Sequence, residues 1–133
     1  MATALNFALT EREENAKKIK TARDIFVKTI VDELPFVTVN GAENKLISNA
    51  SITFSGVSGE ALLYNLDLNG VCASNGSACS TGSIEPSRTL IAIGLSDADA
   101  RSTVRFSFGK ENSVDDAIYS ANCVIDCVKR LKK

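Results

Sequence analysis

The sequence predicts an α+β fold: a mainly antiparallel sheet covered by helices on one face, with a long helix at the N-terminus. Apolar residues recur at helical spacing near both ends of the chain, and residues 103–108 alternate with period two. Short strand-like runs between turn residues lie in the middle. The chain has 133 residues, 44% of them hydrophobic, which suits one globular domain, so we expect residues 1–133 to form a single domain.

The first predicted element is one amphipathic helix from about Thr3 to Val31. Arg12 and Arg23 fall within its apolar arc. We interpret them as arginines at the edge of the stripe whose charged ends reach water, although a surface contact or a neighbouring domain would also explain them. The apolar side itself is expected to contain Leu5, Leu9, Ala16, Ile19, Ala22, Phe26 and Ile30.

Two short strands are predicted after this helix. Residues 36–39 precede the turn Asn40-Gly41, and residues 51–54 alternate apolar and polar side chains.

Four further elements are predicted between residues 54 and 103. Ser58 is expected to cap a helix that ends at Asn69-Gly70, and a short strand with a buried Cys72 should follow at 71–73. Another helix is predicted from Pro86 to Ile93. The run Ser96-Asp97-Ala98-Asp99 is typical of a capping box, so a further helix should begin there.

The period-two run at 103–108 predicts a strand with one apolar and one polar face. Val104, Phe106 and Phe108 share the first face, so Arg105 is expected to point away from the core.

Ser113 and Asp116 are expected to cap a last helix. Cys123 should lie nearly opposite its buried stripe and Cys127 at the flank of that stripe. The stripe is expected to contain Val114, Ala117, Ile118, Ala121, Ile125 and Val128.

Composition narrows the functional classes. The formal net charge of −1 argues against nucleic acid or an anionic membrane as the main partner. No run approaches the roughly 20 apolar residues of a membrane span, and the first residues show no signal pattern, so we expect a cytoplasmic protein. In that setting the four cysteines are expected to be free thiols.

Cys79 is the leading candidate for a functional residue. It stands in the run 74–87, where most of the neighbouring residues are glycine, alanine, serine or threonine. Such a backbone takes up left-handed and extended conformations readily and stays solvated, which suits a loop that moves a thiol. A packed small residue is the alternative interpretation.

The run from Val71 to Lys110 resembles the C-terminal domain of NifS/IscS-type cysteine desulfurases, which are pyridoxal-phosphate enzymes of the class V aminotransferase group. Four blocks carry the resemblance, at residues 74–80, 83–87, 93–97 and 100–109. The resemblance implies that the chain is the small C-terminal domain of a fold type I enzyme.

The resemblance also implies roles for two residues. Cys79 occupies the position of the family cysteine that takes sulfur from L-cysteine as a persulfide, giving L-alanine, for iron–sulfur cluster or thio-cofactor synthesis. Arg105 matches the family arginine that holds the substrate α-carboxylate. A surface salt bridge is the alternative interpretation of Arg105.

The large domain that holds pyridoxal phosphate in this family has no counterpart in the chain. The sequence contains no histidine, and its lysines lack the setting of a Schiff-base lysine. We therefore expect the cofactor only in the full-length enzyme, and an isolated chain that is inactive. The expected partners are the large domain, an iron–sulfur scaffold or tRNA-thiolation protein as sulfur acceptor, and a second copy of the full-length enzyme in a homodimer.

Other functions compete with that of a cysteine desulfurase fragment. A persulfide carrier without a cofactor, or a protein-interaction domain, is the main alternative. A zinc site is disfavoured because Cys72-x6-Cys79 and Cys123-x3-Cys127 lack paired two-residue knuckles. A phosphatase loop is disfavoured because the spacing of Cys79 and Arg88 is too long, and no metal is expected.

Overall fold

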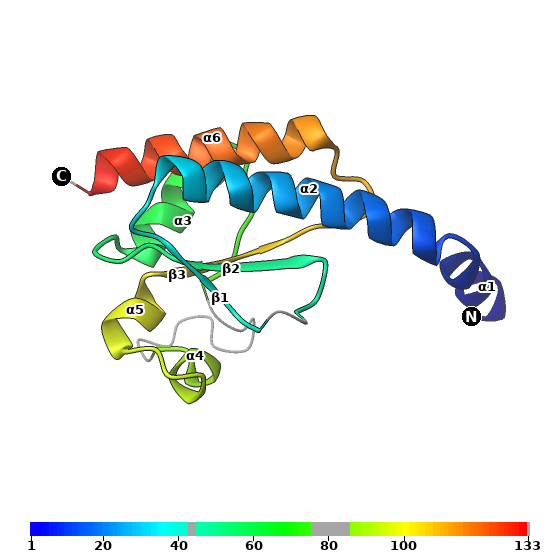
Figure 1. The fold of residues 1–133 in the computed structure, drawn as a ribbon, viewed down its shortest axis with the longest axis horizontal. Coiled ribbons are helices and arrows are strands. Elements are labelled where there is room, and N and C mark those ends of the chain that lie inside the picture. Colours follow the sequence, from blue (N-terminus) through cyan, green and yellow to red (C-terminus); the bar gives the residue numbers. More distant parts are fainter. Residues whose placement is uncertain (43–44, 76–85, 133) are drawn as a thin grey trace.

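The computed structural model describes residues 1–42, 45–75 and 86–132 (Figure 1). Cys79 therefore lies outside the described residues. Along the chain the elements are α1 (Ala2–Thr10), α2 (Arg12–Glu33), β1 (Thr38–Asn40), β2 (Asn49–Thr53), α3 (Gly59–Leu68), α4 (Arg88–Ala92), α5 (Asp97–Arg101), β3 (Thr103–Ser107) and α6 (Val114–Leu131).

The three strands form an antiparallel sheet in the order β1-β2-β3. Helices α2, α3 and α6 lie over one face, and α4 and α5 lie beyond the other side (Figure 1). In register, Val39 pairs with Ile52 and Ile52 with Val104, which places apolar side chains together on the face toward the three helices. The predicted α+β fold with a mainly antiparallel sheet is confirmed.

The hydrophobic core lies between this face and the helices. Ile52 and Val104 are fully buried beneath α2, α3 and α6. Phe26 of α2 joins the layers, since its ring centroid lies 4.8 Å from that of Phe106 and 5.3 Å from that of Phe108. Aromatic pairs at these distances contribute about 0.5–1.5 kcal/mol beyond the area they bury.

Helices α2 and α6 run side by side in the same direction (Figure 1). Lys129 near the end of α6 lies 2.9 Å from Glu33 at the end of α2, and Lys110 just before α6 lies 3.5 Å from Glu11 at the start of α2. These exposed ion pairs contribute at most about 1 kcal/mol each, so the shared apolar stripe is what holds the helices together.

The single helix predicted from Thr3 to Val31 is wrong, because the structure has two helices that meet at Glu11. Glu11 has φ −91° and ψ −2°, and the Thr10 hydroxyl donates to the Asn6 carbonyl one turn earlier. Such back-bonding bends helices, and α1 buries no side chain that would hold it in line.

The predicted strand at 71–73 is also wrong. Helix α3 ends as predicted, in a Schellman motif: Gly70 has φ +73°, and the Val71 N–H donates to the Leu66 carbonyl at 2.9 Å. The chain then joins the sheet only at Ser74. Cys72 is consequently exposed rather than buried.

The buried side of α6 differs from the prediction. Val114 and Ile118 are exposed, whereas Val124 and Cys127 are buried. The buried side is rotated toward Val124 and Cys127, because α6 packs against α3 as well as α2.

For Arg23 the prediction of an arginine at the edge of the apolar stripe, with its charged end in water, is wrong. Its side chain is only 8% exposed, and Nε lies 3.0 Å from Oδ1 of Asp24 without hydrogen-bond geometry. The charged end therefore does not reach freely into water. Arg12, by contrast, is exposed as predicted.

The predicted helix caps at Ser58, Ser96 and Ser113 are confirmed. Each hydroxyl accepts a hydrogen bond from the backbone N–H three residues later, and at α6 the Asp116 carboxylate accepts the reciprocal bond from the Ser113 N–H. Among the described residues, none of the helices has the length and apolar character needed to cross a membrane.

Candidate functional site

Arg105 occupies the middle of β3 and lies between β2 and Ser74. On one side it pairs with Ser51 of β2. On the other it forms a two-bond bridge with Ser74: the Arg105 N–H donates to the Ser74 carbonyl at 2.7 Å, and the Ser74 N–H donates to the Arg105 carbonyl at 3.0 Å. The chain that leads toward Cys79 is therefore fixed directly beside Arg105.

These pairings form a polar row across the sheet. Asn40 pairs with Ser51, Ser51 with Arg105, and Arg105 with Ser74. Residues directly opposite one another in antiparallel strands place their side chains on the same face. The row thus lies on the face opposite the hydrophobic core, and the predicted orientation of Arg105 is confirmed.

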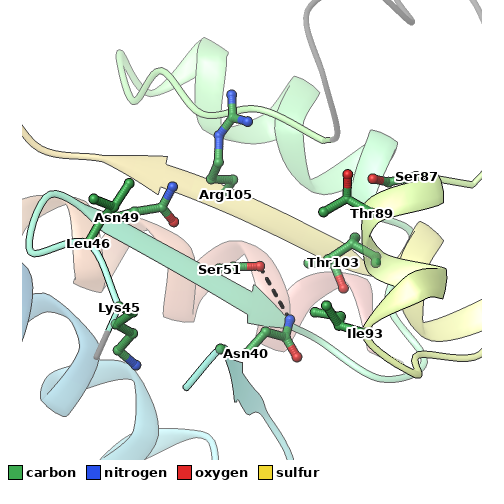
Figure 2. Close-up of a pocket in the computed structure, with 12 residues that line it drawn as sticks. Asn40, Lys45, Leu46, Asn49, Ser51, Ser87, Thr89, Ile93, Thr103 and Arg105 are labelled. Atoms are coloured by element: carbon green, nitrogen blue, oxygen red, sulfur yellow. Dashed lines mark hydrogen bonds between the residues drawn. The ribbon is translucent and has the colours of Figure 1, made fainter. Parts of the chain in front are cut away.

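The Arg105 side chain is half-buried. Figure 2 shows it extending away from Asn40 and Lys45. Within the part of the chain that the structure describes, no carboxylate forms an ion pair with it. The alternative interpretation, that Arg105 forms a surface salt bridge, therefore finds no acidic partner among those residues.

A chain of hydrogen bonds supports the polar face next to Arg105. Thr103 donates to the Asp99 carbonyl at 2.6 Å, so its single proton is used and Thr53 must be the donor in the 2.7 Å contact between the two hydroxyls. The Asn40 amide then donates to Thr53 at 2.9 Å and to Ser51 at 3.3 Å. Because Asn40, Thr53 and Thr103 are buried, this satisfied network fixes the floor of the site.

A close contact between backbones fixes the approach to the site. A Cβ at Gly59, the first residue of α3, would lie 2.4 Å from the Arg101 carbonyl oxygen and 3.0 Å from Nδ2 of Asn75. Only glycine lets the start of α3 approach the end of α5 this closely, with the Asn75 side chain packed beside both.

A cavity of about 340 Å³ lies over the polar face. The sheet contributes Asn40, Asn49, Ser51, Thr103 and Arg105 to its walls, and Figure 2 shows Lys45 and Arg105 at opposite ends. Opposite the sheet, the wall is formed by α4 and its flank, at Ser87, Thr89, Leu90 and Ile93.

The cavity carries positive charge without a compensating acid. Among the described residues that line it, Lys45 and Arg105 are cationic and none is an aspartate or glutamate. It can therefore bind an anion, because a pair of cations in a partly enclosed space attracts negative charge more strongly than the same groups in open water.

Three of the cavity residues are not evident from the sequence. Local patterns place Asn40 in a turn, give Lys45 no role and make Ser51 only part of a strand. The polar positions Asn49, Ser51 and Thr53 alternate along β2 and contain a signal for a polar face, but only the strand register brings them to Arg105.

Comparison with known proteins gives the family. The sequence profile of the family described as "Aminotransferase class-V" matches residues 1–118. The chain belongs to the class-V aminotransferase family.

Within this family the chain is related to NifS/IscS-type cysteine desulfurases. It is 42% identical over 123 residues to an "IscS-like cysteine desulfurase" of Mycobacterium tuberculosis, covering 89% of the chain and 31% of that protein. It is 31% identical to "Cysteine desulfurase IscS" of Clostridium botulinum over all of the chain and 34% of that protein. The chain thus spans about a third of the length of these curated relatives.

Two solved structures show the same fold. A NifS-like protein superposes with a TM-score of 0.81 at 21% identity, over 98% of this chain and 32% of that one. A NifS-like protein from Rickettsia africae gives a TM-score of 0.74 at 24% identity, over 90% of this chain and 31% of that one.

Among the described residues, the cavity does not provide the full set of groups that holds pyridoxal phosphate, the cofactor that the class-V family implies. Such a site has a Schiff-base lysine, an acid or an arginine at the pyridine nitrogen, and commonly a ring that stacks on the cofactor. The described cavity residues provide no acid, and the sequence provides no histidine to stack on the ring. Lys45 and Arg105, with the neutral polar side chains between them, can bind a carboxylate.

Proposed function

We propose that residues 1–133 are the small domain of a cysteine desulfurase in which Cys79 takes sulfur from L-cysteine and Arg105 binds the substrate α-carboxylate. The observation that carries this proposal is the position of Arg105. Its guanidinium stands over a polar sheet face, without a carboxylate partner among the described residues, on the strand that anchors the segment leading to Cys79.

Arg105 suits a carboxylate for two reasons. A guanidinium offers two parallel N–H groups that match both oxygens, which a lysine does not reproduce. Both of its backbone groups are also hydrogen-bonded to Ser74, and its strand pairs with β2 opposite Ser51, so the base of the side chain is fixed before a ligand binds.

Cys79 supplies the nucleophile in the proposed reaction. Its thiolate attacks the substrate sulfur, an S–S bond forms, and the substrate Cβ–Sγ bond breaks. The net change is L-cysteine plus the Cys79 thiol giving L-alanine plus the Cys79 persulfide. Cys79 follows Ser74 by five residues, which span at most roughly 18 Å when extended, so chain length alone limits how far Cys79 can be from the Ser74 backbone.

A companion domain supplies what this chain lacks. Pyridoxal phosphate is bound there and provides the electron sink for breaking the carbon–sulfur bond. The persulfide then passes to an iron–sulfur scaffold or a tRNA-thiolation protein in the cytoplasm, and the full-length enzyme is a homodimer. The 31–34% coverage of the cysteine desulfurase relatives supports such a division.

The test is sulfide release from cysteine after the chain is mixed with the large domain of a desulfurase and pyridoxal phosphate. We expect activity only with both proteins present, and its loss in Cys79→Ser but not in the control Cys123→Ser. We expect Arg105→Lys to raise KM for cysteine about 10- to 100-fold, because one of two charge-assisted hydrogen bonds is lost, and Arg12→Lys to leave it unchanged.

Two results would contradict the proposal. Sulfide release by the purified chain alone would show that no companion domain is needed. Failure of the mixture, combined with transfer of a persulfide from an intact desulfurase to Cys79, would favour a persulfide carrier instead.

A further inference from the structure

The cavity over the polar face is longer than a single carboxylate requires. Its volume of about 340 Å³ lies within the range of small-molecule pockets. Arg105 occupies one end, and Lys45 occupies the other (Figure 2). The proposed function uses only the end at Arg105.

Lys45 has the features of a second anion contact. Its stem packs beside Gly41, where an added Cβ would lie 3.8 Å from the lysine Cδ. The side chain is half-buried, and no acid within the described chain forms an ion pair with its ammonium. A cation that lines a cavity without a partner is free to bind an anionic group.

The walls between the two cations are apolar on one side. Leu90 and Ile93 of α4 and Leu46 next to Lys45 line the cavity, facing the neutral polar side chains of Asn49 and Ser51. Such walls suit methylene groups better than a further charge.

We propose that this cavity binds an extended dianion with an apolar middle, one end at Arg105 and the other at Lys45. The backbones of β3 and β1 are two strand spacings apart, about 10 Å, and Arg105 extends away from Lys45 (Figure 2), so the two ends of the ligand are at least that far apart. A long dicarboxylate, or an amino acid whose side chain ends in a second acidic group, has this form. The inference rests on the proposed role of Arg105 as a carboxylate anchor.

The test measures binding to the 133-residue chain by amide chemical-shift titration at low ionic strength. The probes are suberate, its monomethyl ester of equal length, and the short dianion malonate. We expect suberate to bind about tenfold more tightly than the ester, and malonate to bind no better than the ester, because only suberate reaches both cations.

The matched variants are Lys45→Gln in the cavity and Lys17→Gln on the exposed side of α2. We expect Lys45→Gln to abolish the preference for suberate over the ester and Lys17→Gln to retain it. Equal affinities for suberate and ester in the unchanged chain would overturn the inference. So would equal losses in both variants, tight binding of malonate, or no binding at all.

Different results would reject the inference and the proposed function. Loss of the suberate preference alone, with Arg105→Lys still raising KM for cysteine in the two-protein assay, rejects only the second anion contact. An unchanged KM in Arg105→Lys rejects the carboxylate anchor itself.

Discussion

At the scale of single residues, the site depends on how closely backbones approach one another. Arg105 keeps its orientation because both of its backbone groups are bonded to Ser74. Next to Ser74, the Asn75 side-chain amide and the Arg101 carbonyl oxygen both lie so close to Gly59 that a Cβ there has no room. Substituting Gly59 therefore tests whether this junction is as tight as the distances indicate.

We expect Gly59→Ala to destabilise the protein by about 1–3 kcal/mol, because its Cβ would lie 2.4 Å from the Arg101 carbonyl oxygen, which belongs to the backbone and cannot rotate away. Gly109→Ala is the control, since the nearest atom there is 3.8 Å away. Urea unfolding of both variants gives the comparison. Equal stabilities would show that the junction relaxes without cost.

At the scale of elements, α6 is the helix whose start is most fully specified. The Ser113 hydroxyl caps the Asp116 N–H at 3.0 Å, and Asp116 Oδ2 accepts from the Ser113 N–H at 2.9 Å and from its hydroxyl at 2.8 Å. These bonds lower the pKa of Asp116, the backbone bond having the larger effect. The carboxylate also lies at the positive end of the helix dipole.

This lowered pKa predicts the direction of a pH effect. Because the folded-state pKa of Asp116 lies below its unfolded value, its contribution to the free energy of unfolding is complete above the unfolded pKa and is lost as pH falls through the folded one. We expect Asp116→Asn to reduce stability at neutral pH and to match the unchanged protein at the acid end. Urea midpoints between neutral pH and strong acid measure the gap, and a gap that stays constant with pH would contradict the assignment.

The hydroxyl half of the capping box gives a separate prediction. We expect Ser113→Ala to cost about 1 kcal/mol at neutral pH, the usual effect of removing a helix N-cap, and Ser113→Thr to retain most of the stability. Thermal or urea unfolding measures both variants. If alanine is tolerated as well as threonine, the cap does not stabilise α6.

At the scale of the whole molecule, helix α1 presents an exposed apolar surface. Leu5, Phe7 and Leu9 of α1 are each 61% exposed, and α1 projects beyond the body of the protein (Figure 1). The chain spans about a third of its cysteine desulfurase relatives, so a companion domain is the occupant that we propose for this surface. Without that domain, apolar groups in such a position promote association.

We expect the isolated chain to self-associate through α1. Phe7→Gln should raise the midpoint concentration of association about five- to tenfold, because a partly buried aromatic ring contributes about 1 kcal/mol or more. Tyr64→Gln on α3 is the control, an equally exposed aromatic residue away from α1. Sedimentation analysis distinguishes them, and an equal effect of the two substitutions would assign association to another surface.

The sequence by itself determined the features that depend on local chemistry. Serine caps, glycine helix ends and the alternation at 103–107 are set within a few residues, so the ends of α3, the starts of α5 and α6 and the outward direction of Arg105 were predictable. The four sequence blocks likewise indicate the family, because each is a continuous run of residues whose identities do not depend on packing. The role of Cys79 stays a prediction, because that residue lies outside the described part of the chain.

Only the tertiary structure decided features that need partners distant in sequence. Packing against other segments, or its absence, decides three such features. They are the break at Glu11, the exposure of Cys72 and the burial of Cys127. The cavity belongs to the same class, since the sheet register brings Asn40 and Ser51 to Arg105 and the turn after β1 brings Lys45 opposite α4. Register and packing are fixed by the whole core rather than by local preference, which is why local patterns did not reveal the second cation of the site.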